Sequence, residues 1–388
     1  MKLGQISNEA GIMIGRYSMD GNTSDVVWNK EALKMIKEIQ TKFNNENSIY
    51  VADCKLMTQE LFLTMTREDS ILFLSRVPAN FDHKLESRMR IKAYKNDNWI
   101  DVGKINDTKK GCTYEIQSFI EDVYGVPTRL VVVKSSASLV SFEASQKKNK
   151  SKIETAIKEL NKKVFACEKD ARTEWELFCK KYGKKPYIYS MSLEKIITEK
   201  RPRGNPGKNP KPAKIITQFS LNIKLEKDNQ EAMRLLRQKA ESFVLISNVP
   251  ESISTATQLL KEYKGQIVVE LNFKVLKSPA LVSTIFLKKE ERIEAMMMLI
   301  GVALMIRALI LYQLRKGFKE SGENPRIGHS GTVLKTITMG LFHNAMDSLF
   351  IEREKGGDYL IYIIPKEKQR VLTLLRYLGL DISDLLSN

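Results

Sequence analysis

The sequence predicts an α/β fold that is interrupted by a large basic insertion. Short apolar runs of strand type alternate with helical periodicity near both ends of the chain. The stretch from Lys147 to Lys214 instead carries 20 Lys or Arg residues against 8 Asp or Glu residues. The chain has 388 residues, of which 43% are apolar, and this is ample for a hydrophobic core.

The N-terminal segment predicts a hairpin followed by a helix. Two short strands are expected at Leu3–Ser7 and Gly11–Ser18, joined by a turn-like sequence. Capping side chains at Asn22–Asp25 then precede a stretch of helical periodicity, Val27–Phe43. Asp25 itself is interpreted as a capping residue of this helix.

The next elements continue the alternation of strands and helices. A short apolar run, Ser48–Asp53, ends on a carboxylate, and Thr58–Thr66 has a helical pattern. The run Ile71–Val77 is apolar throughout, which indicates a fully buried strand.

The middle of the chain is more polar and strongly basic. It contains a strand-like run, Thr128–Lys134, and a predicted long charged helix, about Gln146–Tyr182. Lys200–Lys214 follows with six basic residues, four prolines and no acid, so it cannot lie inside a helix or a sheet. Two interpretations stay open for it, a flexible linker and a basic arm that follows a phosphate backbone.

Apolar elements resume after Ser242. Phe243–Ser247 predicts a strand, and Ser252–Lys277 and Glu290–Phe318 predict two long helices. The most apolar run, Ala295–Ile306, has 12 residues before Arg307, fewer than the ~20 that cross a bilayer. A buried helix of a protein without a membrane segment is therefore expected.

The net charge points to nucleic acid as the partner. The chain has 63 basic and 46 acidic residues, a formal charge of +17, and this sign attracts phosphate backbones. An anionic membrane surface is the second partner to consider. Four scattered cysteines without a CxxC pair predict reduced thiols in a cytoplasmic protein, and the N-terminus has no signal-peptide pattern. If DNA is the partner, we expect the protein to be nucleoid-associated.

One acidic residue stands out in the first of the two C-terminal helices. Glu270 lies among Ile267, Val268, Val269, Leu271 and Phe273. A carboxylate on a helix that is apolar almost all round is costly unless it is paired or holds a metal. On the residues alone, an ion pair with a nearby Lys or Arg and a metal ligand are equally supported.

The residues around Glu270 resemble a box of the DDE insertion-sequence transposases of prokaryotes. That box has Tyr, Arg, Glu and Lys at the spacing of Tyr263, Gln266, Glu270 and Lys277, so Gln266 replaces the Arg of many members. Upstream blocks are similar too, and the resemblance covers the chain from about Leu3 to its end. The upstream blocks that resemble the family are DGNTSD (20–25), YVADCKL (50–56), FLSRVPANF (73–81), KRPRGNP near Arg203, and FVLISN (243–248).

The resemblance implies an RNase H-like mixed sheet and a two-metal site. It assigns Asp53 as the second and Glu270 as the last of three catalytic carboxylates, both of them ligands of Mg²⁺ or Mn²⁺. It further implies DNA contacts for the box and for the basic loop. The residues concerned are Tyr263, Gln266, Lys277, Lys200, Arg201, Arg203 and Lys208.

The resemblance also implies a missing part. The family places its first catalytic Asp on the first, central strand of the sheet, ahead of the position that matches Leu3. We therefore expect an N-terminally truncated chain that is inactive alone, unless an N-terminal fragment or a full-length transposase complements it. A homodimer is a further expected partnership.

Three functions are compatible with these residues. The first is a DNA transposase that cleaves and joins transposon ends, the second a DNA-binding transposase remnant without catalysis, and the third a hydrolytic nuclease. The expected domain order is a first part of the catalytic core, a basic insertion, a second core part with the Glu helix, and a C-terminal region. Their boundaries are 1–82, 83–242, 243–318 and 319–388.

Overall fold

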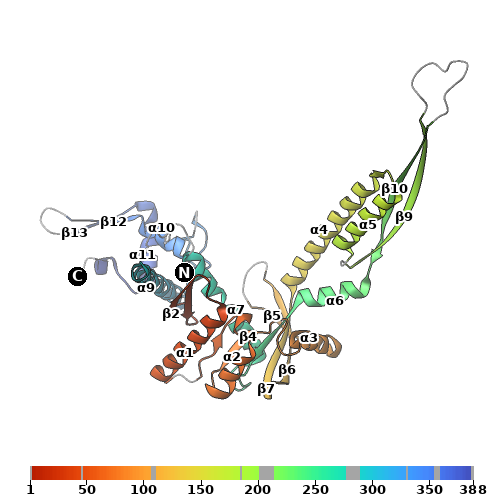
Figure 1. The fold of residues 1–388 in the computed structure, drawn as a ribbon. Helices are drawn as coiled ribbons and strands as arrows, with labels where there is room; N and C mark the ends of the chain where they lie inside the picture. The colour runs from red at the N-terminus through yellow and green to blue at the C-terminus, as the bar shows by residue number, and fades with distance from the viewer. Residues whose placement is uncertain are drawn as a thin grey trace, which may run out of the picture. The chain divides into compact units, whose positions relative to one another are not determined.

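The computed structural model describes most of the chain, and its ribbon is shown in Figure 1. The chain divides into two compact units, each described separately below. The terminal unit comprises residues 1–56 and 262–388, and the central unit comprises residues 57–261. The predicted boundaries at residues 82, 242 and 318 stay predictions. The described residues are 2–44, 47–105, 111–183, 186–200, 214–276, 289–328, 331–353 and 359–385.

The terminal unit begins with the predicted hairpin and helix. Strands β1 (Lys2–Ser7) and β2 (Met13–Met19) pair antiparallel and are followed by α1 (Asp25–Phe43). Ser24, and not Asp25, caps α1, because the Ser24 side chain accepts the N–H of Val27 and Asp25 is already the first helical residue. Gly4 lets α1 approach the hairpin, since a Cβ there would lie 2.1 Å from the Trp28 ring.

A short strand and a 3₁₀ turn follow α1. Strand β3 covers Tyr50–Val51, and the turn η1 covers Cys54–Leu56. Leu56 is fully buried, and η1 contacts α1, so this segment is anchored to the helix by apolar packing. The strand predicted at Ser48–Asp53 is confirmed in a shortened form.

The C-terminal part of the terminal unit has its own apolar core. Helices α9 (Glu290–Ser321), α10 (Met339–Met346) and α11 (Lys368–Tyr377) contribute to it, together with hairpin strands β12 (Leu349–Arg353) and β13 (Tyr359–Ile363). The buried residues of this core are Leu314, Ile327, Leu334, Ile337, Leu341, Ala345, Ile363, Val371, Leu374, Leu375 and Tyr377.

Helix α9 is less buried than its sequence predicts. Leu304 and Leu314 are buried, but Leu299 is 69% and Ile306 is 54% exposed among the described residues. By length and composition, the helix Glu291–Ser321 could cross a membrane. Its most apolar 18-residue stretch has a mean hydropathy of 2.2, and 11% of that stretch is buried inside the protein. A single helix of this kind is weak evidence for a membrane span, and Arg307 lies within it.

The central unit is built on an antiparallel sheet. The strands that this unit contributes pair antiparallel in the order β4, β11, β7, β6, β5. Every residue of β11 is buried, as expected for an inner strand of a covered sheet. The strands predicted at 71–77, 128–134 and 243–247 are confirmed. Their observed bounds are β4 (Phe73–Arg76), β5 (Ile100–Lys104), β6 (Thr113–Val123), β7 (Val126–Ser135) and β11 (Ser242–Ser247).

Two helical segments complete the body of the central unit. Helix α2 (Gln59–Leu63) continues into a π-helical turn, Thr64–Glu68, and α3 (Leu85–Asn96) contacts β7 and β11. The helix predicted at Thr58–Thr66 is thereby confirmed. Edge-to-face aromatic contacts join Phe62 to Phe73, with ring centroids 5.9 Å apart.

The rest of the central unit is an arm of helices and a long β-ribbon (Figure 1). Strands β9 (Tyr187–Lys200) and β10 (Lys214–Asp228) pair antiparallel along their length. Helices α4 (Ser136–Asn161), α5 (Glu168–Tyr182) and α6 (Gln230–Glu241) accompany them. The arm's core contains Ile153, Ile157, Leu160, Phe165, Ala171, Phe178, Tyr187, Leu221 and Ile223.

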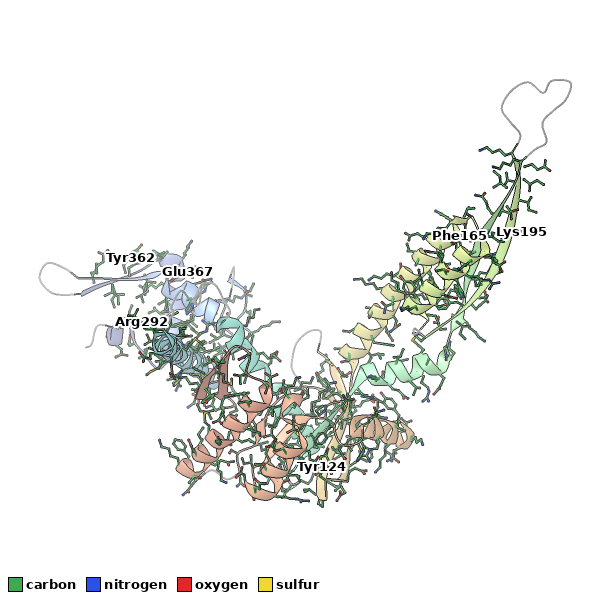
Figure 2. The ribbon with its side chains drawn as sticks, in the orientation of Figure 1. Tyr124, Phe165, Lys195, Arg292, Tyr362 and Glu367 are labelled. Atoms are coloured by element: carbon green, nitrogen blue, oxygen red, sulfur yellow. The ribbon has the colours of Figure 1, made fainter. Side chains whose placement is uncertain are left out.

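The prediction of one long helix over Gln146–Tyr182 is wrong. Helix α4 ends at Asn161, and strand β8 (Val164–Phe165) pairs with β10 before α5 begins. Phe165, labelled in Figure 2, is buried opposite Phe219. This long-range pairing buries an aromatic side chain, and it outweighs the helical pattern of the flanking sequence.

Candidate active site

Asp53 lies at the junction between β3 and the η1 turn of the terminal unit. Its carboxylate Oδ1 accepts the N–H of Lys55 at 2.9 Å, and its carbonyl oxygen accepts the N–H of Leu56 at 3.2 Å. The residue therefore opens the turn with its own side chain. The side chain of Asp53 is exposed, as a residue that binds metal and substrate requires.

Tyr50 is the nearest titratable neighbour that responds to Asp53. Burial raises the pKa of the Tyr50 hydroxyl well above its ordinary value, and the Asp53 carboxylate raises it further. Tyr50 stays a neutral hydrogen-bonding group at any physiological pH.

Glu270 lies in the first turn of a helix that is separate from the one before it. The single helix predicted over Ser252–Lys277 is divided into α7 (Ala256–Gly265) and α8 (Ile267–Leu276). Gln266 separates the two, and its carbonyl oxygen accepts the N–H groups of Val269 and Glu270 at 2.9 and 3.3 Å. The preceding Gly265 is the sequence signal for this break, because glycine weakens a helix.

The environment of Glu270 differs from the one its sequence predicts. The apolar sequence around it suggests a buried carboxylate, yet Glu270 is exposed and Leu271 is 50% exposed among the described residues. The helix is not covered all round by described residues, so the carboxylate is accessible to solvent. Burial therefore imposes no requirement for an ion pair at this position.

The other box residues lie close to the break between the helices. Tyr263 is in the last turn of α7 and is half-buried. Gln266 is half-buried too, and its amide Nε2 is buried without a hydrogen-bond partner among the described residues. Lys277 of the box lies outside the described residues, as do Arg201, Arg203 and Lys208 of the basic loop. Lys200 is exposed at the end of β9.

Asp53 and Glu270 belong to the same compact unit, although 216 residues separate them in the sequence. Within the described part of the chain, no three His, Cys, Asp or Glu side chains gather in a group that could hold a metal ion. The two carboxylates are accessible oxygen donors of the kind that Mg²⁺ and Mn²⁺ prefer. The four cysteines are free thiols, as their scattered positions predict.

A buried arginine, which no sequence pattern indicated, holds the loop before α7. Arg129 of β7 is 5% exposed, and its Nη1 donates to the carbonyl oxygens of Ser254 at 2.6 Å and Val249 at 3.3 Å. Glu251 pairs with the same guanidinium. Burial lowers the pKa of Arg129, and these partners compensate the buried charge. Arg129 thereby ties the start of α7 to the central sheet.

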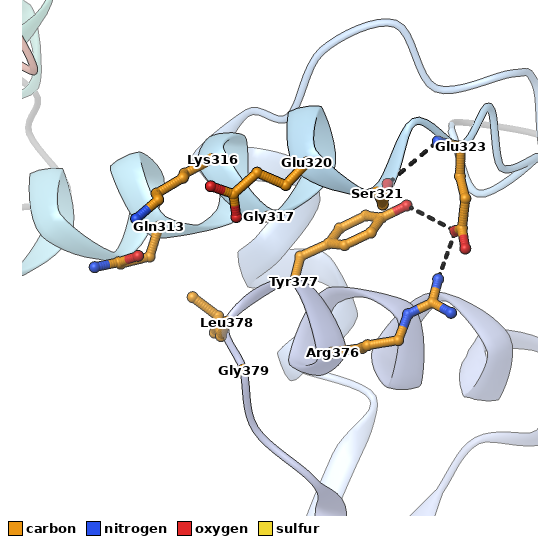
Figure 3. A pocket seen from close by; sticks show the side chains of 10 residues that line it. All are labelled: Gln313, Lys316, Gly317, Glu320, Ser321, Glu323, Arg376, Tyr377, Leu378 and Gly379. Atoms are coloured by element: carbon orange, nitrogen blue, oxygen red, sulfur yellow. Dashed lines mark hydrogen bonds and ion pairs between the residues drawn. The ribbon is translucent and has the colours of Figure 1, made fainter.

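A cavity of the terminal unit is lined by none of the predicted site residues. It has a volume of about 420 Å³ and lies between the end of α9 and the end of α11 (Figure 3). Glu323 accepts hydrogen bonds there from Arg376 and from the Tyr377 hydroxyl. These contacts pair the Glu323 carboxylate, and we interpret the cavity as a packing gap between the two helix ends.

Comparison with known families decides the assignment. Residues 13–306 match the model of the transposase DDE domain, which is more than half of the chain. The chain belongs to the DDE transposase family. No curated protein sequence matches it.

The match covers every element discussed above as part of the site. It includes β2, β3 with Asp53, the whole arm, and α7 and α8 with Glu270, and it ends inside α9. Transposition of DNA is thus the function of the family, and the mixed α/β architecture agrees with a DDE transposase.

Proposed function

We propose that this DDE transposase cleaves transposon ends and joins them to target DNA, with Asp53 and Glu270 as catalytic carboxylates. One observation carries the proposal. Both residues are exposed carboxylates in one compact unit, and both fall inside the residues that match the transposase domain. Each begins a local turn or helix that fixes its backbone, so neither carboxylate depends on a long loop for its position.

The donor set suits a pair of Mg²⁺ or Mn²⁺ ions. When bound, such ions activate a water molecule or a 3′-hydroxyl and stabilise the leaving oxygen. Asp53 and Glu270 would hold them through their carboxylate oxygens. Tyr50 remains neutral beside Asp53, so it adds no negative charge to the proposed metal site.

DNA binding is the second part of the proposal. The formal charge of +17 supports it, because clustered Lys and Arg residues attract phosphates and release counterions. Tyr263, Gln266 and Lys277 would contact DNA near the scissile phosphate. Gln266 can donate hydrogen bonds but supplies no charge, so this contact would be weaker than the one an Arg makes. Lys200, Arg201, Arg203 and Lys208 would bind the backbone further away.

A third carboxylate has to complete the metal site. We propose that it comes from a strand outside these 388 residues, which an N-terminal fragment or a full-length transposase could supply. Strand β1 pairs with β2 in a two-stranded sheet of the described residues, and its other edge supports this proposal because an open edge can accept a strand. A homodimer, acting in the cytoplasm at the nucleoid, would bring two transposon ends together.

Complementation tests the proposal. The 388-residue protein is incubated with Mn²⁺ and labelled DNA ends of the element that encodes it, with and without a peptide carrying the upstream strand. We expect no cleavage by the chain alone, and cleavage with the peptide that disappears in Asp53→Asn and Glu270→Gln. Cleavage by the chain alone that needs Glu270 would place the third carboxylate within these residues. Cleavage that survives both substitutions would refute the assignment.

A DNA-binding regulator without catalysis is the second candidate. The lack of a three-carboxylate group among the described residues favours it. Such a protein would bind transposon ends whether or not Mg²⁺ is present, and no complementing strand would restore cleavage. A hydrolytic nuclease would cleave with the peptide but would join no ends.

A further inference from the structure

The β9–β10 ribbon extends beyond the helices that support it. Leu193 and Leu221 still pack into the arm's core, but every residue of β9 from 194 to 200 is exposed. Figure 1 shows the two strands continuing past the ends of α4 and α5, and Lys195 marks this region in Figure 2. We call residues 196–200 and 214–218, which form the last five cross-strand pairs, the ribbon end.

The ribbon end exposes isoleucines where water would favour polar side chains. Ile197 is 60% and Ile215 is 66% exposed. Ile197 pairs with Thr217, and Ile215 is two residues from Thr217, so the two isoleucines are diagonal neighbours on one face. Leu193 and Leu221 continue the same face and are covered by helices, whereas no described residue covers the isoleucines.

The charges at the same place call for an anionic partner. Lys200 lies directly opposite Lys214 at the end of the ribbon, on the face opposite Ile197 and Ile215, and like charges in a cross-strand pair destabilise a ribbon. The sequence that joins them, residues 201–213, adds four basic residues and no acid. From 194 to 219 the sequence has seven basic residues against Glu194 and Glu199. A polyanion would relieve this repulsion.

We infer that the ribbon end is a wedge that enters the minor groove of double-stranded DNA and bends it. Ile197 and Ile215 insert at a base step, and the long side chains of Lys200 and Lys214 reach past the ribbon's edges from its other face to the phosphates beside the groove. A DNA duplex combines the two required properties, a charged exterior and an apolar base stack. This inference rests on the proposed action on DNA, and it adds a second, architectural role for the arm.

The side chains of the ribbon end favour the minor groove over the major groove. Sequence-specific recognition of bases in the major groove relies mainly on Arg, Lys, Asn or Gln side chains. On the face that carries Ile197 and Ile215, the only polar side chains of the ribbon end are Thr217 and Glu199. Apolar side chains that insert from the minor groove unstack a step and kink the duplex by about 20–90°. The structure therefore predicts bending with little sequence preference.

Energy transfer between dyes at the two ends of a thirty-base-pair duplex tests this inference. The full chain should bring the ends closer together, as a kink of about 20–90° requires. A minor-groove-binding polyamide on the same duplex should block the bend. The Ile197→Thr/Ile215→Thr variant should bind DNA but leave it straight, because Thr keeps the strand preference and removes the apolar wedge.

Two control variants and a folding check distinguish the effect of Ile197 and Ile215 from the effect of the lysine charges and from misfolding. Ile188→Thr changes another exposed isoleucine of β9, 39% exposed and close to the base of the ribbon, and it should bend DNA like the unchanged protein. Lys200→Ser/Lys214→Ser should lower the slope of log affinity against log salt by about 1.8. Circular dichroism confirms that each variant is folded.

The outcomes distinguish this inference from the proposed function. Binding without bending, bending that the polyamide does not block, or bending that survives the double isoleucine change would overturn the wedge and leave the transposase assignment intact. Failure to bind any duplex would remove the DNA-binding part of the proposed function and the wedge with it. Isoleucine-dependent binding to phosphatidylserine vesicles in place of DNA would also overturn the wedge.

Discussion

The side chain of Asn248 substitutes for a strand partner of Phe73. Its Oδ1 accepts the N–H of Phe73 at 2.8 Å, and its Nδ2 donates to the carbonyl oxygen of Ile71 at 2.9 Å. Asn248 thus extends the pairing of β4 with β11 past the end of the strands. It is the last residue of the FVLISN block and immediately precedes the loop that Arg129 holds.

Asn248→Ala should destabilise the central unit. The substitution leaves the backbone groups of Ile71 and Phe73, both fully buried residues, without partners, which costs about 1–3 kcal/mol. Urea unfolding measures the loss. Asn8→Ala is the matched control, because the Asn8 side chain accepts an exposed N–H from Ile12 and should cost less. Equal losses in the two variants would contradict the role of Asn248.

Gly317→Ala should destabilise the terminal unit. A Cβ at Gly317 would lie 2.2 Å from the carbonyl oxygen of Tyr377, and this backbone atom cannot turn aside as a side chain can. Forcing α9 and α11 apart should cost about 1–3 kcal/mol. Gly340→Ala in α10 is the control, since its nearest neighbour is 4.0 Å away, and it should stabilise the helix slightly. Thermal unfolding compares the two variants.

Cys112 should be the most reactive thiol below neutral pH. Burial alone would raise its pKa, but hydrogen bonds from Ser135, the N–H of Ala137 and Ser136 outweigh burial and lower the pKa to about 7. The thiolate fraction, and with it the alkylation rate, should rise through pH 7 and then level off. Mass spectrometry after iodoacetamide treatment follows each cysteine.

Cys179 provides the internal comparison. Burial raises its pKa, and Glu176 raises it further, so Cys179 should react only at higher pH. If Cys112 and Cys179 were alkylated with the same pH profile, the hydrogen bonds around Cys112 would have no effect on its titration.

DNA affinity should fall steeply with salt and drop when the basic loop is neutralised. Replacement of Lys200, Arg201, Arg203 and Lys208 by Ser removes four charges and should reduce the salt slope by about 3.6 if all four contact phosphates. Filter binding over a salt series measures it. Neutralising Lys147, Lys148, Lys169 and Lys180 on α4 and α5 is the charge-matched control. If the loop substitutions change DNA affinity and its salt slope no more than the substitutions on α4 and α5 do, or not at all, the linker interpretation is supported.

The sequence predicted the strands of this fold better than its helix boundaries. Buried apolar runs such as Phe243–Ser247 depend mainly on local composition, and they were placed correctly. The break between α4 and α5 depends on Phe165 pairing with Phe219, a contact between distant residues that no local pattern contains. Gly265 did signal the break before α8, but one glycine within a helical pattern is a weak signal.

The surroundings of the proposed catalytic residues could not be predicted from the sequence. Spacing and resemblance singled out Asp53 and Glu270, whereas the exposure of Glu270 depends on which elements cover α8. The roles of Arg129 and Asn248 depend on carbonyl groups that become neighbours only in the folded chain. Side-chain contacts to backbone groups have no sequence pattern of their own at this separation.

Iron-mediated cleavage of the protein backbone tests the central claim most directly. Fe²⁺ replaces Mg²⁺ at oxygen-ligand sites, and with ascorbate and peroxide it cuts the chain next to the bound ion. If Asp53 and Glu270 share a metal site, cuts should occur near both residues, and Asp53→Asn or Glu270→Gln should abolish both cuts together. Lys55→Ala and Lys274→Ala, which change exposed neighbours of each carboxylate, should leave them unchanged. Cuts at one position that persist when the other carboxylate is removed, or no cuts near either at saturating Fe²⁺, would contradict the shared site.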